Sequence, residues 1–392
     1  SGAAGMHAVI RQRQGIAWTK EEPKGIQANL EHLVSVQVKP NVQPVAEDAL
    51  QLAYGAAKAP KLVSEICSPL LKLRQKALIQ VIKTMATPKE LEMLLAAGLV
   101  HALNTAAKDD DDIVRTSANL ALAQAARYPG GQKAMLANGS IEVLIESDGA
   151  GIYSENEGVR AHALRAVLEL AKNPDGCRAL IQAYAVKVLI ARISNEVPPL
   201  QGLALMALQQ LMVQRDGVAH AISEGAMAVI IPILSSQEQL AREKAALALG
   251  ALTTEFPEKR EAGPSALQPL VTMLADEALS ARHAASSALM SLTVENSVKE
   301  LAIGAQVPEA LDVALDECVR NETLPEGDRD KLISALTVNL VQTIDQVAEH
   351  PKARRYFKSK GTLRKLQQFE TSSNIHVRKH TSKAIAQITW MP

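Results

Sequence analysis

Apolar and polar residues follow one another along most of the chain with the spacing of an amphipathic helix. One such stretch, AREKAALALGAL at residues 241–252, recurs in altered form as VRTSANLALAQA, VRAHALRAVLEL, ARHAASSALMSL and VRKHTSKAIAQI. In the copy that contains Arg115, Ala118, Leu122 and Ala125 fall on one broad apolar stripe of a helix. No stretch shows the strict alternation of a half-buried strand. The pattern therefore predicts an all-α protein built from a repeated helix.

The leading polar residue of each copy sets the period of the repeat. These residues are Arg74, Arg115, Arg160, Gln201, Arg242, Arg282, Lys331 and Arg378. Their successive intervals are 41, 45, 41, 41, 40, 49 and 47 residues, and a period of about 40–47 residues is typical of armadillo and HEAT repeats. One unit cannot bury its own apolar face, whereas stacked units bury a continuous core. We therefore predict a right-handed armadillo/HEAT-type superhelical solenoid of about eight repeats.

Within each period, a polar break and a short segment follow the repeated helix, and a second long helix comes next. In the copy that contains Arg115 these are RYPGGQ, KAMLANG and a helix that starts at about Ser140. A small residue marks the predicted turn in each period: Gly98, Gly139, Ala185, Gly225, Ser265, Gly304 and Gly361. Glycine suits such a turn because a positive φ costs it little. The arginine that opens each repeated helix is expected to pair with a carboxylate or a loop carbonyl of the adjacent repeat. A direct role in binding a ligand is the alternative.

The repeat divides the chain into an N-terminal arm, residues 1–44, and a solenoid, residues 45–392. The arm contains Pro23, Pro40 and Pro44, which predicts an extended segment. It has too few apolar residues to fold alone. Trp18 is a candidate partner contact, because tryptophan is enriched among interface anchors; the alternative is a tail without function. Residues 45–68 are predicted to form an opening cap, and residues 374–392 a single terminal helix.

The two longest interruptions of the period are candidate interaction loops. They are Asp148–Gly158 and Asn321–Asp330, and both are rich in turn residues. Insertions in repeat proteins map to loops on one face, which is often the binding face. Tyr153 and Leu324 are therefore candidate partner contacts. The alternative is that both insertions are solvated loops without a partner.

Composition and motifs exclude several classes of function. The 42 basic residues are balanced by 42 acidic residues, whereas nucleic-acid and membrane-surface binding need a basic excess. The longest apolar run, AMAVIIPIL, is too short to cross a bilayer, and no secretory signal pattern opens the chain. Cys67, Cys177 and Cys318 are far apart, which predicts core thiols in a reducing compartment. No nucleotide-binding or hydrolase motif occurs, so we predict no catalytic residue, no cofactor and no small-molecule substrate.

Two clusters of potential metal ligands are expected to be structural. His376 and His380 lie one helical turn apart, but Arg378 and Lys379 between them oppose a cation. The acidic run Asp109–Asp112 precedes a predicted helix, where carboxylates favour the positive end of the helix dipole. We therefore predict no metal site.

The period and the helix sequences resemble the armadillo family, whose well-known members include importin-type receptors and catenin-type scaffolds. Importin-type receptors grip extended peptides with a Trp and an Asn four residues apart on each groove helix. The corresponding pairs in this chain are Leu120 and Gln124, Arg165 and Glu169, Met206 and Gln210, Leu247 and Ala251, and Ser287 and Ser291. No pair matches, so the resemblance does not imply that peptide-gripping activity.

The two ends of the solenoid resemble the radial spoke head fourteen family of ciliary armadillo proteins. The matching segments are residues 46–78, with AYG followed by RQKAL, and the closing KAIAQITWMP at residues 383–392. ENSVKELAIGAQVPEALDVAL is more loosely similar. The resemblance implies a non-enzymatic scaffold subunit of the axonemal radial spoke in motile cilia, with other radial spoke proteins as partners. It implies no nucleic acid, membrane or small-molecule substrate. A soluble armadillo adaptor or cargo-binding receptor is the alternative.

Overall fold

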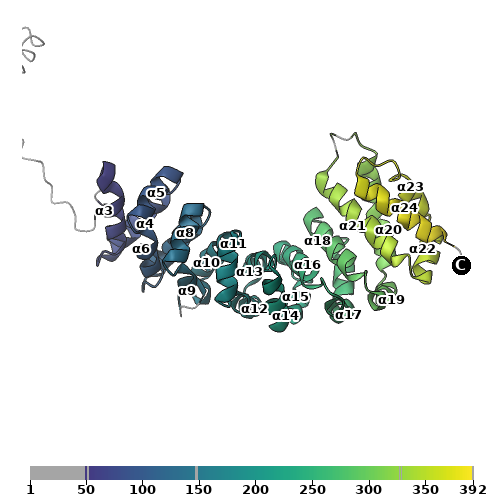
Figure 1. The fold of residues 1–392 in the computed structure, drawn as a ribbon, viewed down its shortest axis with the longest axis horizontal. Helices are drawn as coiled ribbons and strands as arrows, with labels where there is room; N and C mark the ends of the chain where they lie inside the picture. Colours follow the sequence, from purple (N-terminus) through teal and green to yellow (C-terminus); the bar gives the residue numbers. More distant parts are fainter. Residues whose placement is uncertain (1–48, 51–52, 146–148, 326, 328, 391–392) are drawn as a thin grey trace, which may run out of the picture. The chain divides into compact units, whose positions relative to one another are not determined.

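The computed structural model of the chain describes residues 49–50, 53–145, 149–325, 327 and 329–390. Every regular element in these ranges is a helix, and none of their residues lies in a strand. The helices from α3 to α24 follow one another in chain order (Figure 1). The predicted all-α solenoid is therefore confirmed. The predicted arm, with Trp18, lies outside the described residues.

Eight long helices form the inner layer of the solenoid, and each packs against the next. They are α4 (Leu71–Thr84), α7 (Asp112–Ala125), α10 (Glu157–Ala171), α13 (Pro198–Leu211), α16 (Gln239–Leu252), α18 (Leu279–Leu292), α21 (Lys331–Val347) and α24 (Ile375–Thr389). The repeated helix predicted from the sequence is this inner helix. Each unit of the solenoid is named below by its inner helix.

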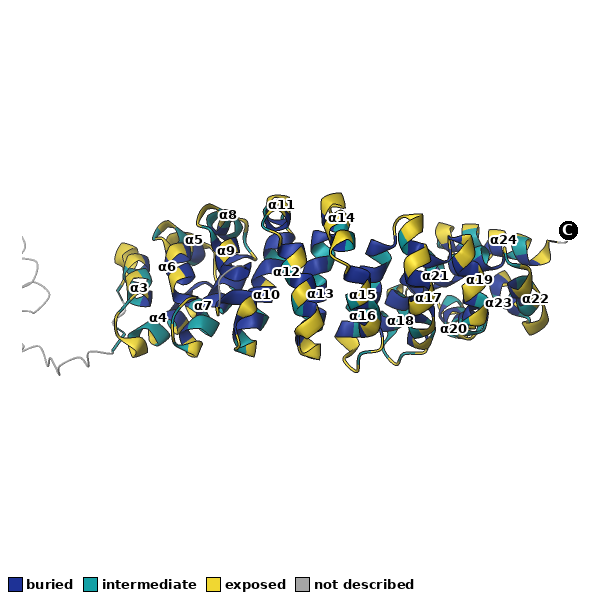
Figure 2. Cartoon of the chain, turned by 90° about the horizontal axis from the view of Figure 1, so that it is seen from below, coloured by how far each residue is buried: buried dark blue, intermediate teal, exposed yellow. Residues whose placement is uncertain are grey.

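A small buried side chain lies seven residues after the N-cap of every inner helix. It is alanine in the first six units and threonine in the last two: Ala77, Ala118, Ala163, Ala204, Ala245, Ala285, Thr337 and Thr381. A small residue at this point lets neighbouring helices approach closely. Leucines such as Leu122, Leu208 and Leu249 fill the space on either side and are fully buried. The buried residues gather between the layers, as the dark blue in Figure 2 shows.

The remaining helices, most of them shorter, cover the outer side of the inner layer. They are α3 (Lys58–Ile66), α5 (Pro88–Ala96), α6 (Leu99–Ala106), α8 (Pro129–Ala137), α9 (Ser140–Ile145), α11 (Pro174–Gln182), α12 (Ala185–Asn195), α14 (Arg215–Ser223), α15 (Ala226–Ile233), α17 (Phe256–Met273), α19 (Asn296–Gly304), α20 (Val307–Glu322), α22 (Pro351–Lys360) and α23 (Thr362–Gln367), with 3-10 turns η1 (Gly55–Ala57) and η2 (Gly151–Tyr153). Among the described residues, no single helix is long and apolar enough to cross a bilayer. Helices α14 and α15 meet that test only as a pair, and they are bent by 87°.

Four of the predicted turns between outer helices are confirmed. Gly98, Gly139, Gly225 and Gly361 have φ angles of 85°, 68°, 72° and 77°. These lie in the left-handed region, which glycine enters without the steric cost that a Cβ atom brings.

The other three predicted turns are wrong. In the α13 unit the left-handed residue is Tyr184 (φ 59°), one residue before Ala185, and in the α21 unit it is Gln306 (φ 59°), two residues after Gly304. In the α18 unit, Ser265 lies inside α17, which continues through Pro264 and Pro269. Helical packing therefore fixes the chain direction in these units without a glycine.

Candidate interaction surfaces

An arginine four residues after the N-cap of most inner helices binds the loop that precedes its helix. Its Nη1 atom donates hydrogen bonds to the carbonyl oxygens six and five residues earlier. For Arg160 these belong to Ser154 and Glu155, at 3.0 and 2.7 Å. Arg74, Arg115, Arg242 and Arg378 repeat the arrangement. The arginine thus fixes the entry of the chain into each of these inner helices.

Three of these arginines, together with Arg282, pair with a carboxylate of the following unit, whereas Arg115 pairs with Asp112 of its own helix. The pairs are Arg74–Asp109, Arg160–Glu196, Arg242–Asp276 and Arg282–Glu317, with closest distances of 2.8, 2.8, 2.6 and 2.5 Å. Each acid lies 34 to 36 residues after its arginine. The predicted structural role of the arginines is therefore confirmed, with the loop carbonyls in their own unit and the carboxylate in the next. We call an arginine with its next-unit carboxylate a unit joint.

The joint between Arg160 and Glu196 is the most deeply buried of the four. The Glu196 side chain is 1% exposed, and Arg192 also donates to it at 2.8 Å. Burial alone would raise the pKa of Glu196, but hydrogen bonds from Arg160 and Arg192 outweigh burial and leave the pKa below its usual value. The pKa of Arg160 is raised, because hydrogen bonds to Glu196 favour its charged form over the cost of desolvation. Glu196 is therefore ionised across the neutral range.

Two units have no arginine at this position. In the α13 unit, Gln201 takes the position of the arginine and donates from Nε2 to the carbonyl of Ile193 at 3.1 Å. In the α21 unit the predicted residue, Lys331, is wrong: it is the first residue of the helix, and the matching position after the N-cap Asp330 holds Ser334. The period was read from the leading basic residue, and this helix begins with an additional one. The α13 and α21 units therefore lack the arginine of a unit joint.

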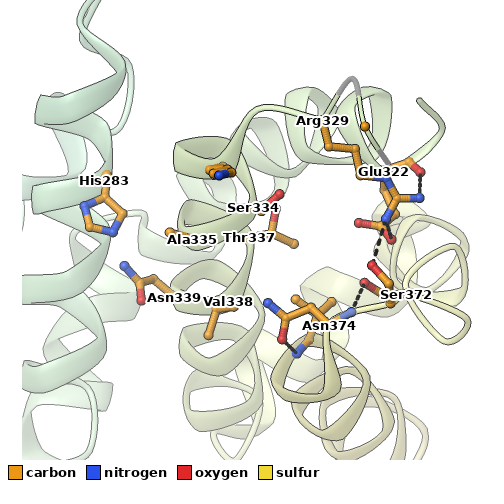
Figure 3. A pocket seen from close by; sticks show the side chains of 14 residues that line it. His283, Glu322, Arg329, Ser334, Ala335, Thr337, Val338, Asn339, Ser372 and Asn374 are labelled. Atoms are coloured by element: carbon orange, nitrogen blue, oxygen red, sulfur yellow. Dashed lines mark hydrogen bonds and ion pairs between the residues drawn. The ribbon is translucent and has the colours of Figure 1, made fainter. Parts of the chain in front are cut away.

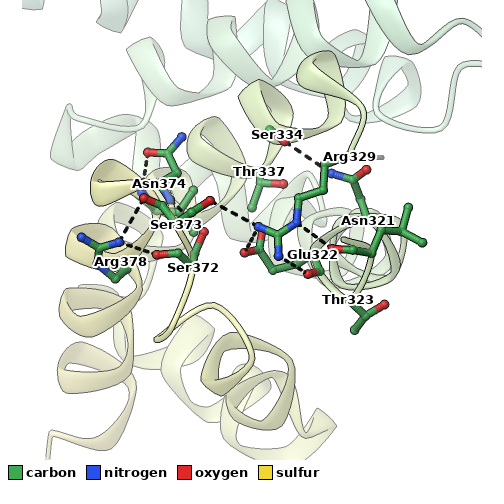
Figure 4. Close-up of polar contacts among 12 residues, drawn as sticks. Asn321, Glu322, Thr323, Arg329, Ser334, Thr337, Ser372, Ser373, Asn374 and Arg378 are labelled. Carbon is green, nitrogen blue, oxygen red and sulfur yellow. Dashed lines mark hydrogen bonds and ion pairs between the residues drawn. The ribbon is translucent and has the colours of Figure 1, made fainter. Parts of the chain in front are cut away.

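Arg329, which precedes α21, takes over the loop contacts in that unit (Figure 4). Its Nη2 atom donates to the Glu322 carbonyl at 2.7 Å, and its Nε atom to the Leu324 carbonyl at 3.0 Å. Nη1 lies 2.7 Å from a carboxylate oxygen of Glu322 and 3.4 Å from Ser373 Oγ in the α24 unit. Arg329 was not identified from the sequence. The sequence did contain a signal for this role. The α21 unit has no arginine at the usual position, and Arg329 stands just before the helix.

The insertion Asn321–Asp330 is a closed loop attached to α20. Asn321 lies in α20, is buried, and accepts a hydrogen bond from the Asp330 amide at 2.9 Å. Within the loop, Leu324 is 44% exposed. The loop borders a cavity of about 760 Å³ between α18, α21 and α24, in which His283 and Asn339 lie opposite Ser372 (Figure 3). Leu324 itself does not line this cavity.

The insertion Asp148–Gly158 is packed into the solenoid over part of its length. Gly151, Ile152 and Ser154 are buried, and Asn156 caps α10 by accepting from two backbone amides. Tyr153 is 40% exposed at the surface of η2. Tyr153 and Leu324 thus lie in different units, before α10 and before α21, and the structure does not bring them together.

The exposed face of the inner helices forms a neutral hollow in the middle of the solenoid. A space of about 620 Å³ is lined by Leu247 and Ala251 of α16, Ser287 and Ser291 of α18, and neighbouring side chains from α13 and α21. These four positions correspond to the Trp and Asn positions of importin-type grooves. The one charged residue in its lining, Lys259, donates to the carbonyls of Thr253 and Thr254 at 2.5 and 2.7 Å. The hollow therefore offers no free charge to a ligand.

The two predicted clusters of acidic and histidine residues take part in structural contacts. Asp109 pairs with Arg74, and Asp111 accepts from the Val114 amide as the N-cap of α7 and from Gln75. His380 lies 3.6 Å from Asp345 of α21. Within the described ranges, no group of three or more histidine, cysteine or acidic residues is arranged to hold a metal ion.

Comparison with known proteins finds a curated relative that matches the chain over nearly its full length. Radial spoke protein 14 of Chlamydomonas reinhardtii is 27% identical over 379 residues, which span 92% of this chain and 93% of the relative. No protein-family model matches the chain. The resemblance of the chain to a radial spoke protein is therefore confirmed.

Solved structures show the armadillo fold. A crystallised engineered protein has a TM-score of 0.71 at 21% identity, covering 85% of this chain and 79% of that protein. A designed armadillo repeat protein in complex with the peptide (KR)4 has a TM-score of 0.53 at 18% identity, covering 60% of this chain and 99% of its own. At these identities the likeness concerns the fold.

Proposed function

We propose that the chain is a non-enzymatic scaffold subunit of the axonemal radial spoke in motile cilia or flagella, and that its partners are other radial spoke proteins. The observation that carries the proposal is the match to radial spoke protein 14 along 93% of that relative. A match of this extent covers the whole array of units and not one common repeat. The proposal includes no role for nucleic acid, membrane lipid or a small-molecule substrate.

The construction of the solenoid suits a scaffold that carries load. Each unit contacts mainly its neighbours, so the array bends by small changes at many junctions and keeps its core. The unit joints resist separation of successive units, because each joins an arginine of one inner helix to a carboxylate of the next unit. A row of similar units also offers many docking positions along one molecule.

Three residues are the proposed partner contacts within this scaffold. Tyr153 and Leu324 are exposed on two separate insertions. Trp18 belongs to the proposed arm, residues 1–44, which would become ordered along a neighbouring subunit. Shortening either insertion, or changing Trp18 to Ala, should reduce incorporation into spokes. Unchanged incorporation would remove the corresponding residue from the proposal.

Fractionation of native cilia tests the proposed location. After detergent extraction and a salt wash, the chain should remain with the axonemes and should be released together with the spoke proteins under conditions that extract spokes. A soluble adaptor or cargo receptor, the alternative, would leave with the detergent-soluble fraction. That result would contradict the scaffold proposal.

A peptide titration tests the alternative directly. The hollow on the inner helices carries no free charge among its lining residues, and it lacks the paired Trp and Asn side chains of importin-type grooves. We therefore expect no saturable binding of a fluorescent (KR)4 peptide at micromolar concentrations. Micromolar or tighter binding would favour a cargo receptor.

A further inference from the structure

Arg378 on the last inner helix makes one half of the arginine arrangement and lacks the other. Its Nη1 atom donates to the carbonyl oxygens of Ser372 and Ser373, as the arginines of earlier units do to their own loops. In four earlier units the same side chain also pairs with a carboxylate of the following unit. Within the described residues, no carboxylate pairs with Arg378. The preceding loop therefore holds the guanidinium in place, and its other nitrogen atoms have no carboxylate partner among the described residues.

The face of α24 that an additional unit would cover is exposed. At earlier junctions, the residues one and five places after an N-cap point toward the next helix. Gln239 donates to Ser280 at 3.4 Å, and a Cβ atom on Gly202 would lie 2.8 Å from Leu240. On α24 these positions hold Ile375, which is 64% exposed, and Lys379. Lys379 is thus exposed where the matching residue of every earlier inner helix is buried or half-buried, whereas the position of Ile375 is exposed in most units, as at Leu71 and Gln239.

Trp390 extends this surface at the other end of α24. It is 50% exposed, and the guanidinium of Arg354 lies 4.6 Å from the centre of its ring. The stacking fixes an apolar side chain at the edge of the exposed face. Ile375 and Trp390 therefore place one apolar contact at each end of α24, with Arg378 and two lysines between them.

The charge around α24 is strongly positive, although the whole chain is neutral. Residues 351–392 contain ten Lys and Arg residues and one acidic residue, Glu370, a net charge of +9; the other 350 residues therefore carry −9. Lys365 pairs with Asp312 and Asp316 of α20. Six of the ten basic residues are exposed and form no ion pair with any described residue. They are Lys352, Arg355, Lys358 and Lys360 on α22, and Lys379 and Lys383 on α24.

We propose that the exposed face of α24 is a docking site for an acidic segment of a partner polypeptide. A carboxylate of that segment pairs with Arg378, as Glu196, Asp276 and Glu317 pair with the arginines of earlier units. Lys379 and Lys383 attract further acidic residues, while Ile375 and Trp390 contact apolar side chains of the segment. An arginine guanidinium can donate to both oxygens of a carboxylate. Because its own loop already holds Arg378 in place, the side chain loses little conformational entropy on binding. The inference stands whether or not the chain is a spoke subunit.

Fluorescence anisotropy with the full chain tests this site. The probe is a fluorescein-labelled 20-residue helical peptide of repeated Glu-Leu-Ala-Glu sequence, and its control has Gln in place of Glu. We expect saturable binding of the acidic probe only. Lys379→Glu with Lys383→Glu should weaken it about tenfold or more, since each lysine changes from attraction to repulsion. Arg378→Gln should weaken it about tenfold, the size of one charge-assisted contact.

The variants are chosen to keep the fold. Gln stands at the same position in the α13 unit, where it donates to the carbonyl of Ile193 near the end of α12, so Arg378→Gln should keep a hydrogen-bond donor at this position without the positive charge. Lys133→Glu with Lys187→Glu changes the net charge equally on the exposed surfaces of α8 and α12, and it should leave binding unchanged. Circular dichroism checks that all variants are folded.

Three results would overturn the proposal. The first is no saturable binding of the acidic probe by the wild-type chain. The second is equal weakening by the α24 variants and by the matched variant on α8 and α12. The third is equal affinity for the acidic peptide, a double-stranded DNA of 20 base pairs and phosphatidylserine vesicles, which would indicate a general polyanion surface and not a carboxylate site.

Discussion

Arg160 and Glu196 form a two-point ion pair across a unit boundary, with Nε and Nη2 of the arginine 2.9 and 2.8 Å from the two carboxylate oxygens. Both side chains are buried, so removal of the arginine leaves Glu196 with Arg192 and the Val197 amide as its partners in a largely dry environment. We expect Arg160→Gln to destabilise the junction by about 3 kcal/mol. Hydrogen exchange of the amides in α12 and α13 measures this locally.

Arg282→Gln is the matched control for this prediction. Its partner, Glu317, has a side chain that is 30% exposed, and water compensates for a lost pair there. The expected loss is about 1 kcal/mol or less. Equal losses in the two variants would show that burial does not set the strength of the joints.

Stability should fall between pH 7.5 and pH 5.5. Burial lowers the pKa of His162, with a further contribution from Arg165, and burial lowers the pKa of His283 against the opposing charge of Glu243. The unfolded chain therefore binds more protons than the folded chain once the pH drops toward about 6.5, so this contribution is present above that pH and lost below it. Thermal midpoints at three pH values measure the effect. The variant His162→Gln with His283→Gln should flatten the profile, and an unchanged slope would assign it to other groups.

Replacing Tyr184 with glycine should stabilise the protein. Tyr184 has a φ of 59°, where a Cβ atom costs about 1–2 kcal/mol, and its side chain is 68% exposed, so little packing is lost. We expect a gain of about 1 kcal/mol, measured by thermal or urea unfolding. Gly225→Ala introduces the same strain where glycine now stands, and it should cost about 1 kcal/mol. A loss in Tyr184→Gly would mean that the tyrosine side chain makes a larger contribution than its exposure indicates.

Arg329→Ala should loosen the loop between α20 and α21. The substitution removes hydrogen bonds to the carbonyls of Glu322 and Leu324. We expect faster cleavage by chymotrypsin at Leu324, because the free energy needed to open the loop should fall by about 1–2 kcal/mol. Adding Ser334→Arg puts an arginine at the position used in other units and should restore part of the protection. No effect of either change would show that Asn321 alone closes the loop.

The inner helices could be predicted from the sequence because their pattern is local and repeated. The Ala and Leu positions recur in the same order in most units, and residues such as Ala118, Leu122, Ala245 and Leu249 are buried. The turn predictions were correct only at glycines, such as Gly98 and Gly225, and wrong at Ala185, Ser265 and Gly304. Tyr184 and Gln306 adopt the same backbone conformation because the packing of the helices on both sides requires it. That requirement comes from tertiary contacts, so the identity of the residue does not indicate it in the sequence.

The unit joints could be predicted in kind but not in detail. The recurring arginine predicted a structural pair, whereas its carboxylates lie 34 to 36 residues later, three of them in loops of differing sequence and one, Glu317, in α20. The α21 unit was misaligned because Lys331 resembles the expected residue. Tyr153 and Leu324 are exposed in the structure. Their role as partner contacts stays a prediction.

Each unit joint is divided between two units, and this division affects how the array can grow by gene duplication. The α18 unit contains an acceptor, Asp276, for the unit behind it and a donor, Arg282, for the unit ahead. If this unit were duplicated in tandem, Arg282 of the first copy could pair with the residue that corresponds to Asp276 in the second copy. A copy of the α13 unit would carry Glu196 but only Gln201 as donor, so its forward junction would lack the ion pair. Units with both halves are therefore the ones from which a longer solenoid can arise in a single step.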